Sequence, residues 1–205
     1  MAQVAEATSI NRFERRRQRS RAALIDAAIA LFQEQGLRAT KVEDICARAD
    51  VATRTFFNHF ETREQLYRAI AHQRAVQMAG QLDALIADDR PFARRLHTLF
   101  VTIGAYLDAR PPYRELVGEM LRVRDGSNEF VRSGVLGAAM LRFVRDGVKR
   151  GEIARRHRPE VLCDLLLGAL MVALGNWSAG QEPKLERALP DAARALLDVF
   201  TAGGK

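Results

Sequence analysis

The chain has 205 residues, of which 48% are hydrophobic and 28% are charged, and its formal net charge is +7. This size is enough for one large or two small domains with an apolar core. Its two cysteines, Cys46 and Cys163, lie far apart in apolar helical patterns and no cluster of histidines accompanies them, so the sequence indicates neither a disulfide framework nor a metal site. We therefore expect a cytoplasmic protein without a metal or cofactor.

The N-terminal segment lacks the apolar stretch of a signal peptide, and the longest apolar run, "LLLGALMVALG" from Leu165, is shorter than the ~20 residues that span a membrane. Secretion and membrane insertion are not expected. The positive charge is concentrated in one place, where a single acid, Glu14, opposes six arginines: Arg12, Arg15, Arg16, Arg17, Arg19 and Arg21. Such a charge run predicts a disordered basic arm over residues 1–18.

Helical spacing begins after this arm. A first helix is indicated by apolar residues at i, i+4, i+7 and i+8, with Gly36 as its C-terminal cap; these residues are Leu24, Ala28, Leu31 and Phe32. A second, short helix is expected to begin at Thr40, because Thr40 and Glu43 form the pattern of a capping box, and to end at Asp50.

A third helix is predicted from Val51 to His59, with Phe56 and Phe60 on its apolar side. A fourth begins with the capping pattern T-x-x-Q at Thr62 and continues toward about residue 86. Five longer helices follow, separated by segments with Pro or Gly, over residues 91–108, 112–123, 128–150, 159–178 and 186–200. The fold class is therefore all-α, with a domain boundary inside the fourth helix.

The third helix has an unusual polar face. Thr53 and Phe57 are four residues apart, as are Arg54 and Asn58, and all four lie away from the buried side. A two-turn helix held by a preceding short helix and a tight break is the layout of a helix-turn-helix, whose second helix enters the DNA major groove. There arginine can bond guanine and threonine can contact a thymine methyl group or a phosphate.

The stretch from about Arg19 to Ile70 closely resembles the N-terminal DNA-binding domain of the tetracycline-repressor (TetR) family. The matching landmarks are "ALF..QG", "T.VEDI", "A..V", "RTFFNHF" and "T.E.L", with their spacing intact. The resemblance implies an N-terminal three-helix helix-turn-helix domain at residues 19–66 and a larger C-terminal helical bundle at residues 67–205 for effector binding and dimerisation.

The resemblance also implies a set of DNA contacts: Thr40, Thr53, Arg54, Thr55, Phe57, Asn58, His59 and Arg63. We assign base reading to Thr53 and Arg54 and phosphate contacts to Thr40, Thr55, His59 and Arg63. For His59 the alternative is a partly buried ring packed beside Phe60. The basic arm would follow the DNA backbone or enter the minor groove, the alternative being a solubilising tail.

Three positions depart from the family pattern. Asp50 replaces the usual glycine of the turn, which is tolerable because Asp visits the left-handed region more readily than most residues. Phe57 replaces a common tyrosine, so a hydroxyl contact to phosphate is lost. Arg63 stands where lysine is frequent and keeps the charge. DNA binding is still expected, with a changed set of contacts.

In the C-terminal part, aromatic, methionine and amphipathic residues are candidates for the lining of an effector pocket: His97, Phe100, Tyr106, Tyr113, Met120, Met140, Phe143, Asn176 and Trp177. Most of them also suit a plain core. Such a lining predicts a mostly hydrophobic effector. The helix "VLCDLLLGALMVALGNW" and the final "DAARALLDVF" helix are expected to form a four-helix interface in a homodimer, although a helix buried within one subunit has the same pattern.

The expected function is a DNA-binding transcriptional repressor, released from a pseudo-palindromic double-stranded operator by a small-molecule effector. An activator or an effector-independent DNA binder is an alternative. A helical enzyme or ligand-binding protein is a further alternative, but no Ser/His/Asp set, carboxylate pair, metal spacing or phosphate-binding Gly loop supports catalysis.

Overall fold

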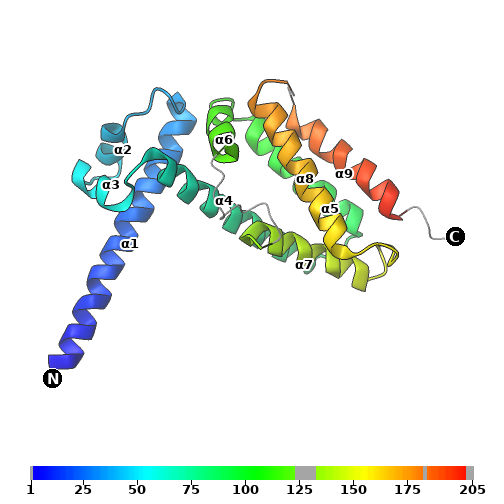
Figure 1. Cartoon of the computed structure of the whole chain (residues 1–205), viewed down its shortest axis with the longest axis horizontal. Coiled ribbons are helices and arrows are strands. Elements are labelled where there is room, and N and C mark those ends of the chain that lie inside the picture. Colours follow the sequence, from blue (N-terminus) through cyan, green and yellow to red (C-terminus); the bar gives the residue numbers. More distant parts are fainter. Residues whose placement is uncertain (1, 123–132, 182–183, 202–205) are drawn as a thin grey trace. The chain divides into compact units, whose positions relative to one another are not determined.

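The computed structural model describes residues 2–122, 133–181 and 184–201, and within these ranges every regular element is a helix. The chain divides into two units, residues 1–70 and residues 71–205 (Figure 1). The boundary falls inside α4 (Arg63–Ile86), the helix in which the sequence pattern placed it. It lies four residues beyond the expected boundary at residue 66.

The first unit contains α1 (Ala2–Gln35), α2 (Val42–Arg48), α3 (Thr53–His59) and the start of α4. Its core is apolar and comes from all four helices: Leu24, Ala28, Phe32, Ile45, Phe56, Phe60, Leu66 and Ile70 are each at most 1% exposed. The caps predicted at the turns are present in part. Gly36, at φ +85°, ends α1, and Asp50 adopts φ +53°, the left-handed conformation expected for it.

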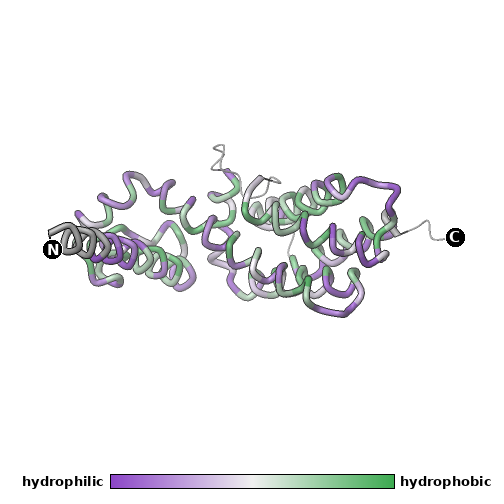
Figure 2. The backbone as a smooth tube through the Cα atoms, turned by 90° about the horizontal axis from the view of Figure 1, so that it is seen from below, coloured by the Kyte–Doolittle hydropathy of each residue, from purple (hydrophilic) through white to green (hydrophobic). Residues whose placement is uncertain are grey.

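The basic arm is not disordered in the structure but forms the first half of α1. The segment between Ala2 and Gln35 contains neither Pro nor Gly and is rich in Ala, Arg, Gln and Glu, which are good helix formers. A helix nucleated by the packed residues after Ser20 can therefore extend toward the N-terminus, because propagation is less costly than nucleation. Figure 2 shows hydrophilic residues in the turns of α1 that follow its grey N-terminal end.

The start of α2 differs from the expected capping box. Thr40 is only 1% exposed, and its hydroxyl donates to the carbonyl of Gly36 at 2.8 Å. The box lies one residue later, where the carboxylate of Asp44 accepts from the backbone N–H of Lys41 at 3.1 Å. The predicted box at α4 is present with a shifted partner, because Thr62 accepts from the N–H of Gln65 while the Gln65 side chain accepts from the N–H of Glu61.

The second unit contains the rest of α4 together with α5 (Phe92–Asp108), α6 (Tyr113–Arg122), α7 (Val135–Lys149), α8 (Pro159–Ser178) and α9 (Leu185–Thr201). These bounds confirm four of the five predicted helices to within two residues. The expected helix at 128–150 begins at Val135 instead, after Gly134 in an extended conformation, and residues 128–132 lie outside the described residues.

Helix α9 lies against α5 and α8 (Figure 1). The approach to α5 is close at Gly104, where an added Cβ would lie 2.5 Å from the backbone nitrogen of Glu186. One turn later Asp108 accepts hydrogen bonds from the backbone N–H groups of Leu185 and Glu186 at 3.2 and 2.9 Å, and from Trp177 Nε1 at 3.1 Å. Asp108 thus caps α9 and ties it to α8.

A buried arginine organises the opposite end of α5. Arg95 is 0% exposed and donates to Asp146 at 2.8 Å, to Glu152 at 2.9 Å and to the carbonyl of Leu85 at 3.0 Å. Its guanidinium also lies over the ring of Phe143, 5.2 Å from the centroid. These contacts join α4, α5 and α7, and they satisfy a charge that would be costly to bury alone.

Helix α8 is, by length and composition, long and apolar enough to cross a membrane. In the structure it packs against α6, α7 and α9 as a central helix of the second unit. Leu162, Leu166, Leu170 and Trp177 on this helix are each at most 1% exposed. This arrangement is typical of the core helix of a helical bundle.

Candidate DNA-reading face and effector cavity

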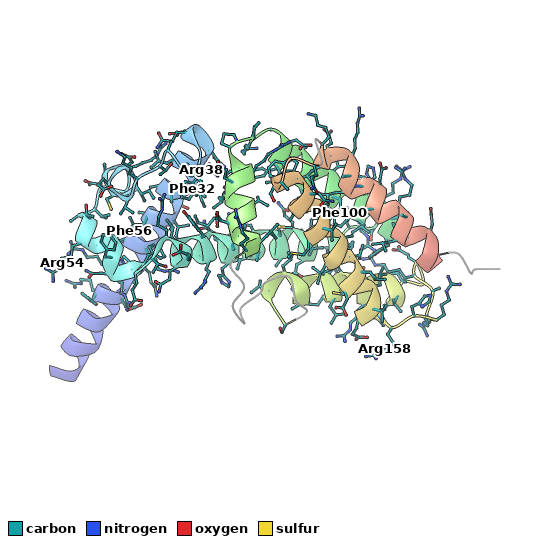
Figure 3. All side chains as sticks on the ribbon, turned by 45° about the horizontal axis from the view of Figure 1, so that its top comes forward. Phe32, Arg38, Arg54, Phe56, Phe100 and Arg158 are labelled. Atoms are coloured by element: carbon teal, nitrogen blue, oxygen red, sulfur yellow. The ribbon has the colours of Figure 1, made fainter. Side chains whose placement is uncertain are left out.

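Helix α3 presents four side chains of one polar face to solvent. Thr53, Arg54, Phe57 and Asn58 are exposed, Phe57 at 53%, whereas Phe56 is 1% exposed. Figure 3 shows Arg54 directed away from the unit, with Phe56 turned inside. The predicted division of α3 into an outward and an inward side is therefore confirmed.

The inward side holds this short helix in place. The ring of Phe56 packs at 5.6 Å from the ring of Phe60 and edge-on at 5.4 Å from that of Phe57. A helix of seven residues is too short to be stable alone in water, so these contacts fix its orientation. The exposed side chains of α3 are consequently positioned by the core rather than by their own helix.

His59 is half-buried and is tied to α1. Its Nε2 lies 3.1 Å from the hydroxyl of Ser20, and its ring lies 6.3 Å from that of Phe60. Burial lowers the pKa of His59, and the positive charges of Arg17 and Arg21 lower it further. The imidazole is therefore neutral near pH 7, which favours the packing alternative over a cationic phosphate contact.

Thr40 and Arg63 occupy positions different from those expected of surface contacts. The buried hydroxyl of Thr40 bonds within the α1–α2 loop, so a phosphate contact at this position stays a prediction for the backbone N–H groups at the start of α2. Arg63 Nη2 donates to the backbone carbonyls of Thr40 and Leu37, at 2.7 and 3.4 Å. A cation in the first turn gains nothing from its own helix dipole, and here it bonds carbonyls of the neighbouring loop. The phosphate role of Arg63 stays a prediction for its remaining N–H groups.

The helical arm creates a basic face that a disordered arm would lack. Four arginines spaced i, i+3, i+4 and i+7 lie along one side of α1 and border a common hollow: Arg12, Arg15, Arg16 and Arg19. All four are exposed. The sequence contains the spacing that places them on one face of a helix. The face itself was not predicted, because the arm was expected to be disordered.

The second unit holds an apolar cavity of about 180 Å³. Its walls come from α4, α5, α6 and α8, and three of the nine predicted lining residues, Tyr106, Tyr113 and Met120, belong to it. The lining residues that sequence reasoning missed lie mainly on α4, including Arg74, Gln77, Met78 and Gln81. The helical period of α4 predicts one face directed inward. The sequence pattern of this helix indicated only the domain boundary, so these residues were not assigned to the cavity.

The other six predicted residues lie elsewhere. Four of them are at most 1% exposed and belong to the closely packed core: Phe100, which Figure 3 labels, Met140, Phe143 and Trp177. The ring of Phe143, for example, stacks on that of Phe92 with centroids 4.7 Å apart. His97 and Asn176 are exposed. Their assignment to the pocket is wrong, because sequence periodicity identifies a buried face without distinguishing close packing from a cavity wall.

One end of the cavity is polar. Arg74 donates to the hydroxyl of Tyr113 at 3.0 Å and to the side-chain oxygen of Gln77 at 2.7 Å. The guanidinium of Arg74 lies 5.7 Å from the ring centroid of Tyr106, and that of Arg110 lies 4.0 Å from the same centroid. Burial raises the pKa of Tyr113, partly offset by Arg74, so its hydroxyl stays protonated at neutral pH.

Helix α8 also carries an apolar stripe that is exposed among the residues that the structure describes. Val161, Leu165 and Val172 are 45%, 44% and 64% exposed and follow one another at helical spacing. Gly168 lies between Leu165 and Val172, and Gly175 follows Val172 by one turn; a Cβ added at either glycine would meet no atom within 4 Å outside the backbone of its own helix. The helix therefore has one face in the core and a second apolar face at the surface.

A helix-turn-helix unit with an exposed polar reading helix, joined through α4 to a helical domain with an apolar cavity, is the arrangement of a DNA-binding regulator. Residues 24–70 match the family "Bacterial regulatory proteins, tetR family". The helix-turn-helix unit is therefore similar to the DNA-binding unit of this family of transcriptional regulators.

Curated relatives agree with this. The chain is 25% identical over 158 residues to the HTH-type transcriptional repressor DhaR of Mycobacterium sp. (strain GP1), covering 74% of this chain and 78% of that protein. It is 35% identical over 133 residues to the HTH-type transcriptional regulator TcmR of Streptomyces glaucescens, covering 64% of this chain. The chain spans half of the length of TcmR.

Among solved structures, the chain is similar to FadR of Thermus thermophilus, a TetR-family transcriptional repressor in complex with lauroyl-CoA. The TM-score is 0.69 at 20% identity, covering 87% of this chain and 93% of that chain. At this identity the likeness shows a shared fold.

Proposed function

We propose that this protein is a homodimeric repressor that binds a pseudo-palindromic operator and is released from it by a small-molecule effector. The observation that carries the proposal is the exposed face of α3, where Thr53, Arg54 and Asn58 project from a helix whose inward side is fixed by Phe56. This is the geometry in which a recognition helix reaches base edges. The name of DhaR, a transcriptional repressor, supports the sign of regulation.

Within this interface, Arg54 and Thr53 read bases, and the remaining contacts hold the backbone. Arg54 is exposed at the N-terminal end of α3, where a guanidinium can bond guanine bidentately. Thr55, Phe57 and Asn58 contribute phosphate or sugar contacts around it, whereas the half-buried His59 packs beside Phe60 and bonds Ser20. The four arginines of the basic face of α1, at residues 12, 15, 16 and 19, add electrostatic affinity that falls with salt.

The dimer forms through α8 and α9, and the partner is a second copy of this chain. The exposed apolar stripe of α8 is the support for this, since a large apolar face on a soluble protein is a mark of an interface. Gly168 and Gly175 leave space for close approach of a facing helix. A two-fold dimer also matches a palindromic operator, because each recognition helix then meets an equivalent half-site.

The effector occupies the cavity of the second unit. Helix α4 supports a link to DNA binding, since one continuous helix begins directly after the reading helix and later lines the cavity with Arg74, Gln77 and Met78. An effector acts by its different affinity for two arrangements of the dimer, one of which fits the operator. The complex of the similar FadR with lauroyl-CoA supports a small-molecule effector. The protein would act in the cytoplasm.

The base-reading role can be tested by measuring which genomic DNA fragments the purified protein retains at moderate salt. Wild type should enrich one palindromic site. Arg54→Ala should reduce the preference for that site by about tenfold, since a bidentate contact to guanine contributes about 1–3 kcal/mol of discrimination. Arg158→Ala, an exposed arginine of the second unit, is the matched control and should leave the preference unchanged.

Two results would overturn the proposal. One is retention by wild type that is sequence-independent and abolished by salt, which would remove operator reading. The other is equal enrichment by wild type and Arg54→Ala, which would remove α3 as the reading helix.

A constitutive DNA binder would enrich a site but would not be released by any compound that raises its melting temperature.

A further inference from the structure

Arg74 is a cation in the wall of an apolar cavity and has only neutral partners. Its contacts among the described residues are the Tyr113 hydroxyl, the Gln77 amide and the face of Tyr106. Among the described residues, no carboxylate forms an ion pair with it. Its Nε is buried and has no hydrogen-bond acceptor. The guanidinium is therefore held in position without a counter-charge.

The ion pairs of Arg95, a buried arginine with a structural role, provide a comparison for Arg74. Arg95 is paired with two carboxylates, those of Asp146 and Glu152, at 2.8 and 2.9 Å. Arg74 is not compensated in this way, and Arg110 brings a second guanidinium to the same aromatic ring. A half-buried cation without an anion beside it makes this end of the cavity electropositive.

The size of the cavity limits what can occupy it. An apolar cavity of about 150 Å³ holds a benzene ring. The volume here, about 180 Å³, is large enough for one ring and a small substituent. The remaining walls are mostly apolar, with Ile103, Val117 and Leu174 from three different helices, and Gln81 and Thr102 are their polar members. A ligand of this size fits with its ring among these side chains and its substituent beside Arg74.

We propose that the cavity binds a small aromatic carboxylic acid, with its single ring against the apolar walls and its carboxylate bonded to the guanidinium of Arg74. The proposal rests on the proposed function, because it names the chemical class of the effector. The hydroxyl of Tyr113 donates a second hydrogen bond to the carboxylate. Arg74 supplies the charge-assisted bond, which is stronger than a bond between neutral groups.

Two compounds of similar size separate the charge from the ring. Benzoate carries the carboxylate, whereas benzyl alcohol carries a neutral hydroxymethyl group on the same ring. Calorimetric titration of the full-length protein should give tighter binding of benzoate than of benzyl alcohol. Benzylamine, which reverses the charge, should not bind detectably.

Variants then assign the effect to Arg74. Arg74→Gln should weaken benzoate at least tenfold and leave benzyl alcohol within about twofold, since a hydrogen bond to a charged group contributes about 1.5–3 kcal/mol. Arg142→Gln, an exposed arginine paired with Asp83 on α4, is the control and should change neither affinity. An unchanged circular dichroism spectrum and melting temperature without ligand establish that Arg74→Gln is folded.

Equal affinity of wild type and Arg74→Gln for benzoate would overturn the inference, as would tighter binding of benzyl alcohol than of benzoate by wild type. DNA retention without ligand, measured on the same preparations, separates this failure from failure of the proposed function. If wild type enriches an operator but does not bind benzoate, the effector class is wrong and the repressor proposal stands. If no operator is enriched while Arg74 still selects benzoate, the site stands without the regulatory role.

Discussion

Asp108 should be the acidic residue on which the second unit depends most for the attachment of α9. Its carboxylate accepts three hydrogen bonds: Oδ1 accepts from Trp177 Nε1 and Leu185 N, at 3.1 and 3.2 Å, and Oδ2 accepts from Glu186 N at 2.9 Å. Asp108→Ala removes all three. Trp177 and Leu185 are each 0% exposed, so their N–H groups cannot find water in place of the carboxylate.

A donor left unsatisfied inside a protein costs about 1–3 kcal/mol, and a hydrogen-bonded donor at the surface contributes about 0.5–1.5 kcal/mol. Two buried donors and the partly exposed N–H of Glu186 therefore predict a loss of about 3–7 kcal/mol in the free energy of unfolding. Asp108→Asn keeps Oδ1 but places an amide NH₂ group against the N–H of Glu186. We expect it to lose about 1 kcal/mol.

Urea unfolding at one fixed protein concentration measures these losses, because a dimer's stability depends on concentration. Trp177 is the single tryptophan of the chain, so its fluorescence reports directly on the site, and far-UV circular dichroism reports on the whole protein. Asp198→Ala, an exposed acid on α9, is the matched control. If Asp108→Ala unfolds within about 0.5 kcal/mol of this control, the range of ordinary surface substitutions, then these hydrogen bonds do not hold α9.

Three further outcomes are expected. Arg19→Gln should reduce the magnitude of the slope of log K against log salt concentration, where K is the association constant for the operator, by up to about 2. Each phosphate contact contributes about 0.9 to this slope, and a dimer has two copies of Arg19. An unchanged slope would show that this arginine does not contact DNA. Val172→Glu, in the exposed stripe of α8, should yield a monomer by light scattering, whereas Val76→Glu, another exposed valine, should leave the dimer intact; two dimers would contradict the α8 interface. The lowered pKa of His59 means that the unfolded state binds its proton more readily, so the free energy of unfolding should decrease as pH falls through the ordinary histidine value of 6.5. The stability of His59→Gln should decrease less steeply over this range than that of a His97→Gln control. Parallel curves for the two variants would show that His59 is not desolvated.

The helices and the reading face could be predicted in large part because their signals are local. The spacing of Phe56 and Phe60 defines one side of a helix, so Thr53 and Arg54 must lie on the other side whatever the rest of the chain does. The same reasoning located α8 at Pro159–Ser178, since its apolar residues and its proline at the first turn are contained in one segment.

The cavity could not be predicted in this way. Phe143 and Tyr106 have similar sequence environments, but one is stacked in the core on Phe92 and the other lines the cavity. Whether a buried residue meets another side chain or an open space depends on how several helices pack, and no single helix contains that information. Arg74 was missed for the same reason, because its partner Tyr113 lies 39 residues away.

By itself, then, the sequence determined the all-helical fold, the two-unit organisation and the outward polar face of α3, because periodicity, capping residues and turn residues act over one or two turns of chain. Tertiary structure decided what distant residues do to one another. It placed the hydroxyl of Thr40 inside, directed Arg63 to the carbonyls of a neighbouring loop, and left Arg74 in a cavity wall with no carboxylate paired to it in the part of the chain that the structure describes. Burial and hydrogen-bond pairing set these roles, and both arise only when the helices pack together.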